Sequence, residues 1–313
     1  MSNTIAMGKE FSMKQYLKDF LKDFEYPHDC AEHLLMCYDA ILQSKTKNEA
    51  LQAALTAYDK NCAITYPELE NYVRIICDSF SYHEYTVWLL LYILMSKRLL
   101  ERYREKEIAE NIWKESIRDL KYKAEECRII KGIHGTFVAD WFPRIFHLRC
   151  FAFGRLEFEL TRFWEDTFVC KNGVVIENRA RVLGVHIPRS DAPLSKEACD
   201  DSYRRAADFF ANEFTGEYVI FTCGSWLLYP KNSEFLHEKS NVIRFGKDYE
   251  IVTVIDYEGE NPNIWRIFDV EFKGDLSALP DDTHLRRAYK EYMLAGGITG
   301  RAYGVKLLSK KSN

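Results

Sequence analysis

The histidine at position 186 is the residue with the clearest chemical potential in this sequence. It stands in a short apolar run, Leu183 to Pro188, directly before a polar loop. An imidazole at that place can act as a general base, because its ordinary pKa lies near neutral pH. A strand histidine can equally be a packed, hydrogen-bonded part of the sheet, and the sequence leaves both interpretations open.

Two hydroxyl groups follow a second β-rich run, Tyr218 to Cys223. Ser225 and Tyr229 could donate a proton to a leaving group. The sequence around Ser225 is not the G-x-S-x-G elbow of serine hydrolases, so that class is not indicated. Cys223 would need a neighbouring base to act as a nucleophile, and no pattern in the sequence supplies one.

The loop from Pro188 to Leu194 is the candidate anion site. Ser195 is a plausible N-cap, and the amides at a helix start attract phosphate. Arg189 would add a mobile positive charge, whereas Asp191 would oppose an anion. The alternative is an ordinary strand-to-helix loop in which Pro193 shapes the entry.

These residues require a scaffold that places two strand ends together. The run 183–187, a helical stretch 195–214 and the run 218–223 read as strand, helix, strand. Parallel strands need a long connection, so this unit predicts adjacent parallel strands joined by a right-handed crossover. A ligand site is expected beyond the carboxyl ends of the two strands.

The first part of the chain predicts a helical bundle. Apolar residues recur at helical spacing through residues 1–125. We expect helices over 13–24, over 29–42 and over 48–58, the last with Asn48 as its N-cap. Further helices are expected to begin at Pro67 and at a capping box that starts at Ser81, and an outer helix is expected over 107–126. The stretch 88–94 is apolar on nearly all sides and predicts the central helix. The expected domains are 1–130, helical, and 131–313, sheet-containing.

Four potential metal ligands lie close together at His28, Cys30, His33 and Cys37. They lack the paired spacing of structural zinc sites, so we expect no metal. The alternative to a metal site is a stripe of buried thiols, since a free cysteine behaves as a small hydrophobe.

The second part predicts an α+β domain with a mixed sheet and a single parallel β-α-β crossover. Strands are expected over 148–153, 155–161, 181–187, 218–223, 249–257 and 265–270, with a hairpin turn at Asn172-Gly173. Helices are expected over 195–214, 232–238 and 280–294. The glycine-rich tail after Leu294 predicts a helix cap at Gly296 followed by a flexible turn.

Composition narrows the class of protein. The net charge of −4 indicates no general affinity for nucleic acid, and the basic end Ser309–Asn313 is short. Nine cysteines without a CxxC pair favour reduced thiols and a cytoplasmic location. The apolar run 85–95 is too short for a membrane span of about 20 residues. We therefore expect no membrane partner, and nothing in the sequence indicates an oligomeric state.

Several stretches of the second part resemble the GNAT superfamily of N-acyltransferases. They are fairly specific to bacterial proteins that carry a helical N-terminal domain before a GNAT-like acyltransferase domain. The matching segments are Leu183–Pro188, Ser225–Pro230, Ser240–Phe245, Leu279–Thr283, Ala295–Gly297 and Tyr303–Val305.

This resemblance implies an acyl-CoA cosubstrate, acetyl-CoA or a longer one, and a small-molecule or peptide amine as acceptor. The acyl-CoA would lie between the strands 183–187 and 218–223. The residues expected at the coenzyme are Val185, Ile187, Arg189 and Ser195. His186 would take the amine proton, and Tyr229 or Ser225 would protonate the thiolate.

The sequence departs from the family at the coenzyme loop. GNAT enzymes usually have Q/R-x-x-G-x-G/A there, whereas this chain reads Arg189-Ser190-Asp191-Ala192-Pro193-Leu194. The glycines are missing, and Pro193 has no amide hydrogen to donate. An alternative function is therefore a catalytically silent GNAT-like module that binds a ligand or a protein.

Overall fold

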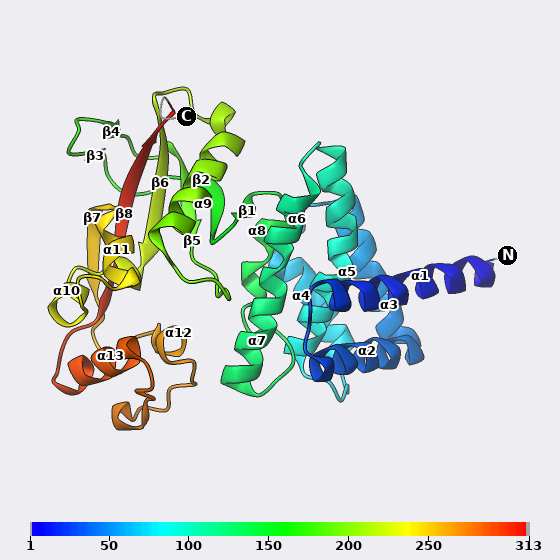
Figure 1. Cartoon of the computed structure of the whole chain (residues 1–313). Helices are drawn as coiled ribbons and strands as arrows, with labels where there is room; N and C mark the ends of the chain where they lie inside the picture. Colours follow the sequence, from blue (N-terminus) through cyan, green and yellow to red (C-terminus); the bar gives the residue numbers. More distant parts are fainter. Residues whose placement is uncertain (1, 311–313) are drawn as a thin grey trace. The chain divides into compact units, whose positions relative to one another are not determined.

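The structure, a computed structural model, describes residues 2–310, with side chains described from residue 13 onward (Figure 1). The chain divides into two compact units, Met1–Phe151 and Ala152–Asn313. The last three residues of the basic C-terminal end, 311–313, lie outside the described residues.

The first unit is a helical bundle, as the periodicity predicts. Its helices are α1 (Ser2–Asp23), α2 (His28–Gln43), α3 (Lys45–Lys60), α4 (Tyr66–Cys77), α5 (Glu84–Glu105), α6 (Glu110–Ile117), α7 (Asp119–Lys131) and α8 (Pro143–Phe146), with a 3-10 turn η1 (Ala139–Trp141).

Helix α5 is the centre of this bundle. Every residue from Thr86 to Ser96 is buried, so the helix packs on all sides and not along one stripe. The segment after α7 packs on the same core: the Tyr92 hydroxyl donates to the Ala139 carbonyl at 2.8 Å, and the Tyr58 hydroxyl donates to the Phe146 carbonyl at 3.0 Å.

Two predicted helix starts in this unit are wrong. Helix α3 begins at Lys45, and Asn48 lies inside it with its amide oxygen accepting from Gln52. Helix α5 begins at Glu84, where His83 Nδ1 accepts the Tyr85 amide. A capping box requires Glu at the third helical position, and Glu84 occupies the first.

The predicted outer helix over 107–126 is two helices, α6 and α7, which meet at Arg118. Trp113, Ile117 and Leu120 are buried although the sequence around them is highly charged.

The second unit is built on a mixed sheet. In the described chain its six strands are ordered β1 (Cys150–Phe153), β2 (Leu156–Arg162), β5 (Arg181–His186), β6 (Tyr218–Ser225), β8 (Gly300–Ser309) and β7 (Glu250–Asp256). Strands β5 and β6 are parallel, and β6–β8, β7–β8 and β2–β5 are antiparallel.

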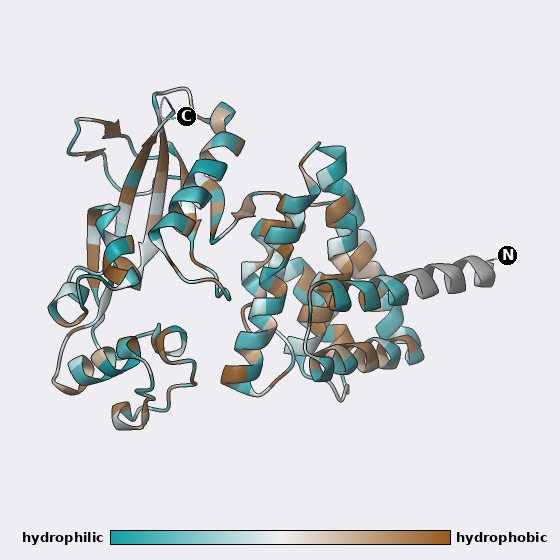
Figure 2. Cartoon of the chain, in the orientation of Figure 1, coloured by the Kyte–Doolittle hydropathy of each residue, from teal (hydrophilic) through white to brown (hydrophobic). Residues whose placement is uncertain are grey.

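The predicted crossover is confirmed. Helix α9 (Lys196–Phe209) joins β5 to β6. It ends five residues earlier than the predicted helix 195–214, and the 3-10 turn η2 (Ala211–Glu213) follows it. Tyr203 of α9 lies against Phe158 of β2 and Phe221 of β6, so α9 covers that face of the sheet. Figure 2 shows a mostly hydrophilic α9 beside strands with more hydrophobic residues.

The opposite face is covered by a small hairpin. Asn172-Gly173 forms the predicted turn between β3 (Phe168–Val169) and β4 (Val175–Ile176), with Gly173 at a φ of 85°. Hairpin residues Cys170 and Ile176 share a buried cluster with Val182 of β5 and Val305 of β8. The sheet therefore has an α9 face and a hairpin face.

Two predictions for the end of the chain are wrong. Residues 264–268 form helix α12 (Ile264–Phe268) instead of a strand, because its apolar residues pack on one side against α13 (His284–Leu294). Gly296 does follow the end of α13 with a φ of 82°, but the tail beyond it is strand β8, between β6 and β7.

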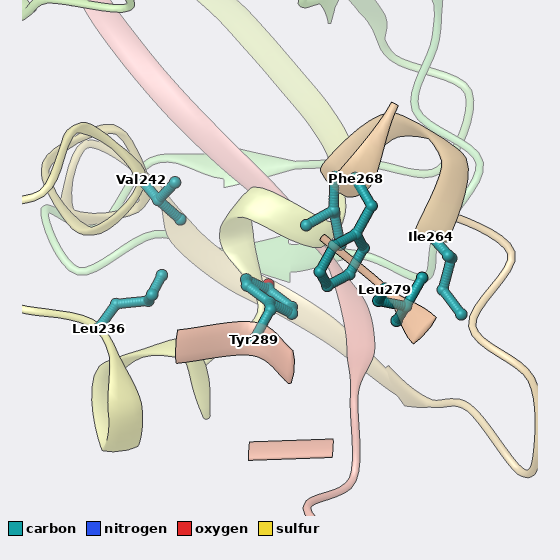
Figure 3. Packing of buried hydrophobic residues seen from close by; sticks show 7 residues of the cluster. Leu236, Val242, Ile264, Phe268, Leu279 and Tyr289 are labelled. Atoms are coloured by element: carbon teal, nitrogen blue, oxygen red, sulfur yellow. The ribbon is translucent and has the colours of Figure 1, made fainter. Parts of the chain in front are cut away.

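A second apolar cluster lies among the helices that follow β6. These are η3 (Trp226–Leu228), α10 (Asn232–Phe235), α11 (Asn241–Lys247), α12, η4 (Leu276–Ala278) and α13. Figure 3 shows Ile264, Phe268 and Leu279 pointing toward one another, with Tyr289 of α13 in the same cluster. Helices α12 and α13 thus share a small hydrophobic core of their own.

Within residues 2–310, no helix combines the length and the apolar character that crossing a bilayer requires.

Candidate functional site

Strands β5 and β6 diverge toward their carboxyl ends. They pair only at Leu183 with Phe221 and at Gly184 with Thr222. Beyond these pairs β5 continues to His186 along β2, and β6 continues to Ser225 along β8. The result is a fork between the two strands, with the inner backbone edges available to an extended ligand.

His186 lies on the hairpin face of this fork with two glutamates of β2. Its Nε2 is 3.2 Å from Oε2 of Glu159, and both side chains are mostly buried. The register places Glu157, which is 2% exposed, directly opposite His186 on the same face. The site thus places one imidazole and two carboxylates on the same face, with the contact to Glu159 at hydrogen-bond distance.

Neither glutamate is singled out by a motif in the sequence. They stand at alternate positions of a strand that was correctly predicted, which puts them on one face. This alternation was a usable signal. The register against β5 was not available, because Glu159 and His186 are 27 residues apart.

Ser225 and Tyr229 lie at the same end of the sheet, each already in a hydrogen bond. The Ser225 hydroxyl accepts the Leu227 amide at 3.2 Å, where it caps η3. The Tyr229 hydroxyl donates to Oδ1 of Asp256 at 2.5 Å, and burial together with this carboxylate raises the Tyr229 pKa. Ser225 is on the α9 face, opposite to His186, since it is two residues from the buried Cys223.

A further hydroxyl pair, missed from the sequence, lies where the fork begins. Tyr303 of β8 is paired with Gly224, and its Cδ2 is 3.5 Å from where a Gly224 Cβ would be. Tyr303 shares the hairpin face with Thr222 and His186. Burial raises the Tyr303 pKa, and a hydrogen bond with Thr222 partly offsets this.

The expected coenzyme residues lie in β5 and in the segment between β5 and α9. Ser195 caps α9 as predicted, with its hydroxyl accepting the Ala198 amide at 3.2 Å. Val185 is buried on the α9 face and Ile187 is half-buried, so a ligand in the fork would meet the backbone of Val185.

Arg189 differs from the expectation of a mobile charge. Its Nη1 donates to Oδ1 of Asp269 at 2.7 Å, so the guanidinium is held by a carboxylate from the end of α12. Nothing in the sequence linked these residues, which are 80 positions apart.

Cys223 is unsuited to nucleophilic chemistry. It is buried on the α9 face, and burial raises its thiol pKa to about 12. The thiolate is the reactive form, so this cysteine is a core residue at neutral pH.

The cysteines and histidines of α2 have other contacts. Cys30 and Cys37 are buried, while the His33 ring packs against Tyr82 and His134. Among the described residues no three His, Cys, Asp or Glu side chains are grouped so that they could hold a metal ion.

Comparison with known families agrees with both units. A family described as N-acyltransferase N-terminal domain matches residues 15–148, and one described as GNAT-like C-terminal domain matches residues 150–306. The chain belongs to the GNAT-like N-acyltransferases. This confirms the resemblance found in the sequence, including for the helical first unit.

Solved structures of acyltransferases share the fold of this GNAT-like chain. One in complex with decanoyl-CoA and teicoplanin is 19% identical, with a TM-score of 0.67 over 93% of this chain and 87% of the other. Another, in complex with decanoyl-CoA, is 21% identical, with a TM-score of 0.67 over 92% and 86%. An acyltransferase mutant with octanoyl-CoA is 19% identical, with a TM-score of 0.66 over 94% and 88%. None of the curated proteins matches the sequence.

Proposed function

We propose that this GNAT-like protein transfers an acyl group from acyl-CoA to an amine. The observation that carries the proposal is the fork between β5 and β6, with His186 and its glutamate partner on one side. The family assignment supports the reaction class. The acyl-CoA complexes of the similar structures support the cosubstrate.

The reaction needs two proton transfers and no covalent enzyme intermediate. The amine nitrogen attacks the thioester carbonyl, a C–N bond forms, and the C–S bond breaks. Glu159 accepts from Nε2–H of His186, which makes Nδ1 the basic nitrogen that takes the amine proton. The carboxylate also stabilises the imidazolium that results.

The departing thiolate takes a proton from a hydroxyl near the fork. Ser225 and Tyr229 are the candidates from the sequence, and Tyr303 is a third from the structure. They can be separated by Ser225→Ala, Tyr229→Phe and Tyr303→Phe, each assayed with acyl-CoA and with an acyl thioester of an acidic aryl thiol. The true donor is the one whose loss slows only the acyl-CoA reaction, because an acidic thiol leaves without protonation.

The coenzyme lies along the fork in this proposal. The backbone of Val185 and Ile187 would contact the extended arm, and the start of α9 with Arg189 would receive the pyrophosphate. Octanoyl- and decanoyl-CoA in the similar structures support a medium-length acyl chain, and teicoplanin in one of them supports a small-molecule or peptide amine as acceptor.

The direct test is calorimetric titration of acetyl-CoA and decanoyl-CoA into wild type and Gly224→Leu. Gly224 is exposed on β6 beyond the last β5 pair, and a Cβ there meets only Tyr303 at an ordinary 3.5 Å. The Gly224→Leu variant should therefore fold, and its leucine side chain should obstruct the fork. Acyl-CoA binding should weaken about tenfold or more, and a tenfold change corresponds to ~1.4 kcal/mol.

The matched control is Gly216→Leu, on an exposed turn where a Cβ would meet nothing within 4 Å. It should bind acyl-CoA like wild type. If wild type binds neither ligand at millimolar concentration, the chain is instead a silent GNAT-like module. Equal binding by Gly224→Leu would show that the coenzyme lies elsewhere.

We place this enzyme in the cytoplasm. The cysteines of the described chain are all free thiols, which suits a reducing compartment.

A further inference from the structure

An alternating chain of charges connects the coenzyme loop to α12 and α13. Nη1 of Arg189 donates to Oδ1 of Asp269 at 2.7 Å, and Nη2 of Arg286 donates to Oδ2 of the same carboxylate at 2.7 Å. Arg286 is in turn held by Asp282 at 2.9 and 3.0 Å and by the Ile267 carbonyl at 3.3 Å. Arg189 is the end of this chain that lies in the loop.

The backbone at Asp269 is unusual. It caps the end of α12 with a φ of 54°, in the left-handed region that non-glycine residues seldom adopt. Strained residues of this kind persist where the surrounding structure holds them and cluster at functional sites. Here the preceding Phe268 is fully buried in the α12–α13 cluster, which fixes the position of the carboxylate (Figure 3).

The loop is anchored on its other side as well. Arg155, next to β2, donates through Nη1 to the Pro188 carbonyl at 2.9 Å. Two successive loop residues are therefore held: Pro188 through its carbonyl by Arg155, and Arg189 through its side chain by Asp269. The loop lacks the glycines that would bring its own amides to a phosphate, and Pro193 has no amide hydrogen.

We propose that Asp269 is a positioning residue that holds the Arg189 guanidinium ready for the pyrophosphate of acyl-CoA. The inference rests on the proposed function, and it assigns phosphate recognition in this chain to a supported side chain in place of a glycine cradle. Asp269 is shared by Arg189 and Arg286, and Asp282 also pairs with Arg286, so the four side chains together carry no net charge. Arg189 uses Nη1 on Asp269, and a guanidinium has further donors for a phosphate oxygen.

The energetic reason is preorganisation. A long side chain that is already held loses less freedom when the ligand binds. Without Asp269, Arg189 would have to be ordered by the ligand, and affinity for phosphate-bearing ligands should fall about threefold to tenfold.

The test compares decanoyl-CoA with decanoyl-pantetheine, which has the same thioester and no phosphate. Asp269→Asn keeps the shape, and asparagine tolerates the left-handed backbone. It should raise the Kd and KM for decanoyl-CoA about threefold to tenfold, leave kcat unchanged, and leave KM for decanoyl-pantetheine as in wild type. The control Asp281→Asn removes a nearby carboxylate that pairs with Lys290 instead, and both ligands should behave as with wild type.

A double-mutant cycle with Arg189→Ala completes the experiment. The Asp269→Asn effect on decanoyl-CoA should largely vanish in the Arg189→Ala background, because Asp269 acts through Arg189. Equal weakening of both ligands would indicate a general structural role and overturn the inference, as would unchanged decanoyl-CoA binding. If wild type binds no acyl-CoA, the proposed function fails and this inference falls with it. Failure of Asp269→Asn alone leaves the proposed function intact.

Discussion

Polar side chains in the bundle core and at the fork have different kinds of partner. In the helical bundle, Tyr58, Tyr92 and Arg102 donate to backbone carbonyls of other segments. In the sheet unit, polar side chains at the fork pair with one another, as in His186 with Glu159 and Arg189 with Asp269. A bond to a backbone carbonyl secures the fold, whereas a pair of ionisable side chains at an open strand end can exchange protons or receive a ligand.

Two histidines test this contrast most strongly. His186→Ala should lower kcat by about 10²–10⁴-fold, since it removes the proposed base. His147 in the first unit instead contacts the Ile64 carbonyl through Nε2 at 2.8 Å. His147→Ala should lower the free energy of unfolding by about 1–2 kcal/mol and leave kcat unchanged. The measurements are CoA release and urea denaturation of both variants. Equal kcat values for the two variants would contradict a catalytic role for His186 and a structural role for His147.

A substitution in the bundle core should lower stability and leave acyl transfer intact, which is the opposite of the result expected at the fork. Leu91 of α5 is fully buried, so Leu91→Ala should cost about 2–5 kcal/mol of stability. At a temperature where it is folded it should still transfer the acyl group. Met36→Ala is the control, because Met36 is exposed on α2. A large loss of kcat in folded Leu91→Ala would assign the bundle a part in the chemistry.

The bundle should also carry a pH dependence of its own. Burial raises the pKa of Asp119 from 3.8 to about 6, with Glu126 adding to the rise and Lys123 opposing it. The folded state therefore binds more protons than the unfolded state between about pH 4 and 6, so stability falls as pH rises through this window.

Asp119→Asn should remove that contribution. Relative to wild type, the free energy of unfolding of Asp119→Asn should rise by on the order of 1–3 kcal/mol between pH 4 and pH 7. Urea denaturation of both proteins across this range is the measurement. A difference between them that does not change with pH would show that Asp119 does not titrate there.

The smallest effect is expected at the coenzyme loop. Arg189→Glu should weaken decanoyl-CoA binding about tenfold or more, from loss of a charge-assisted contact worth roughly 1.5–3 kcal/mol. The melting temperature should fall as well, because the glutamate would face Asp269 where the wild type has the Arg189–Asp269 ion pair. Calorimetry gives the affinity, and unchanged binding would place the phosphates elsewhere.

The sequence predicted the parts that depend on local pattern. Apolar spacing identified the bundle, Asn172-Gly173 the hairpin, and Ser195 the start of α9. The crossover followed because two apolar runs joined by a helix leave few arrangements. The fork was located for the same reason, from strand ends and without knowledge of side-chain contacts.

What the sequence could not predict depends on packing between distant segments. Residues 264–268 have a strand-like composition, and only contact with α13 makes them a helix. The glycines of the tail suggested flexibility. Yet a Cβ at Gly300 would lie 2.4 Å from the Ile255 carbonyl oxygen, so that glycine permits close strand approach inside the sheet. Glu159 and Asp269 were missed because their partners lie 27 and 80 residues away.

Acyl transfer itself is the most direct test of the account. The full chain would be incubated with decanoyl-CoA and a set of small-molecule and peptide amines, including teicoplanin, and the products analysed by mass spectrometry beside His186→Ala and His147→Ala. The account predicts an amine product heavier by one decanoyl group, with equimolar CoA release, from wild type and His147→Ala, and a rate about 10²–10⁴-fold lower with His186→Ala. Acyl transfer by His186→Ala at the wild-type rate, or no transfer to any amine despite tight acyl-CoA binding, would contradict it.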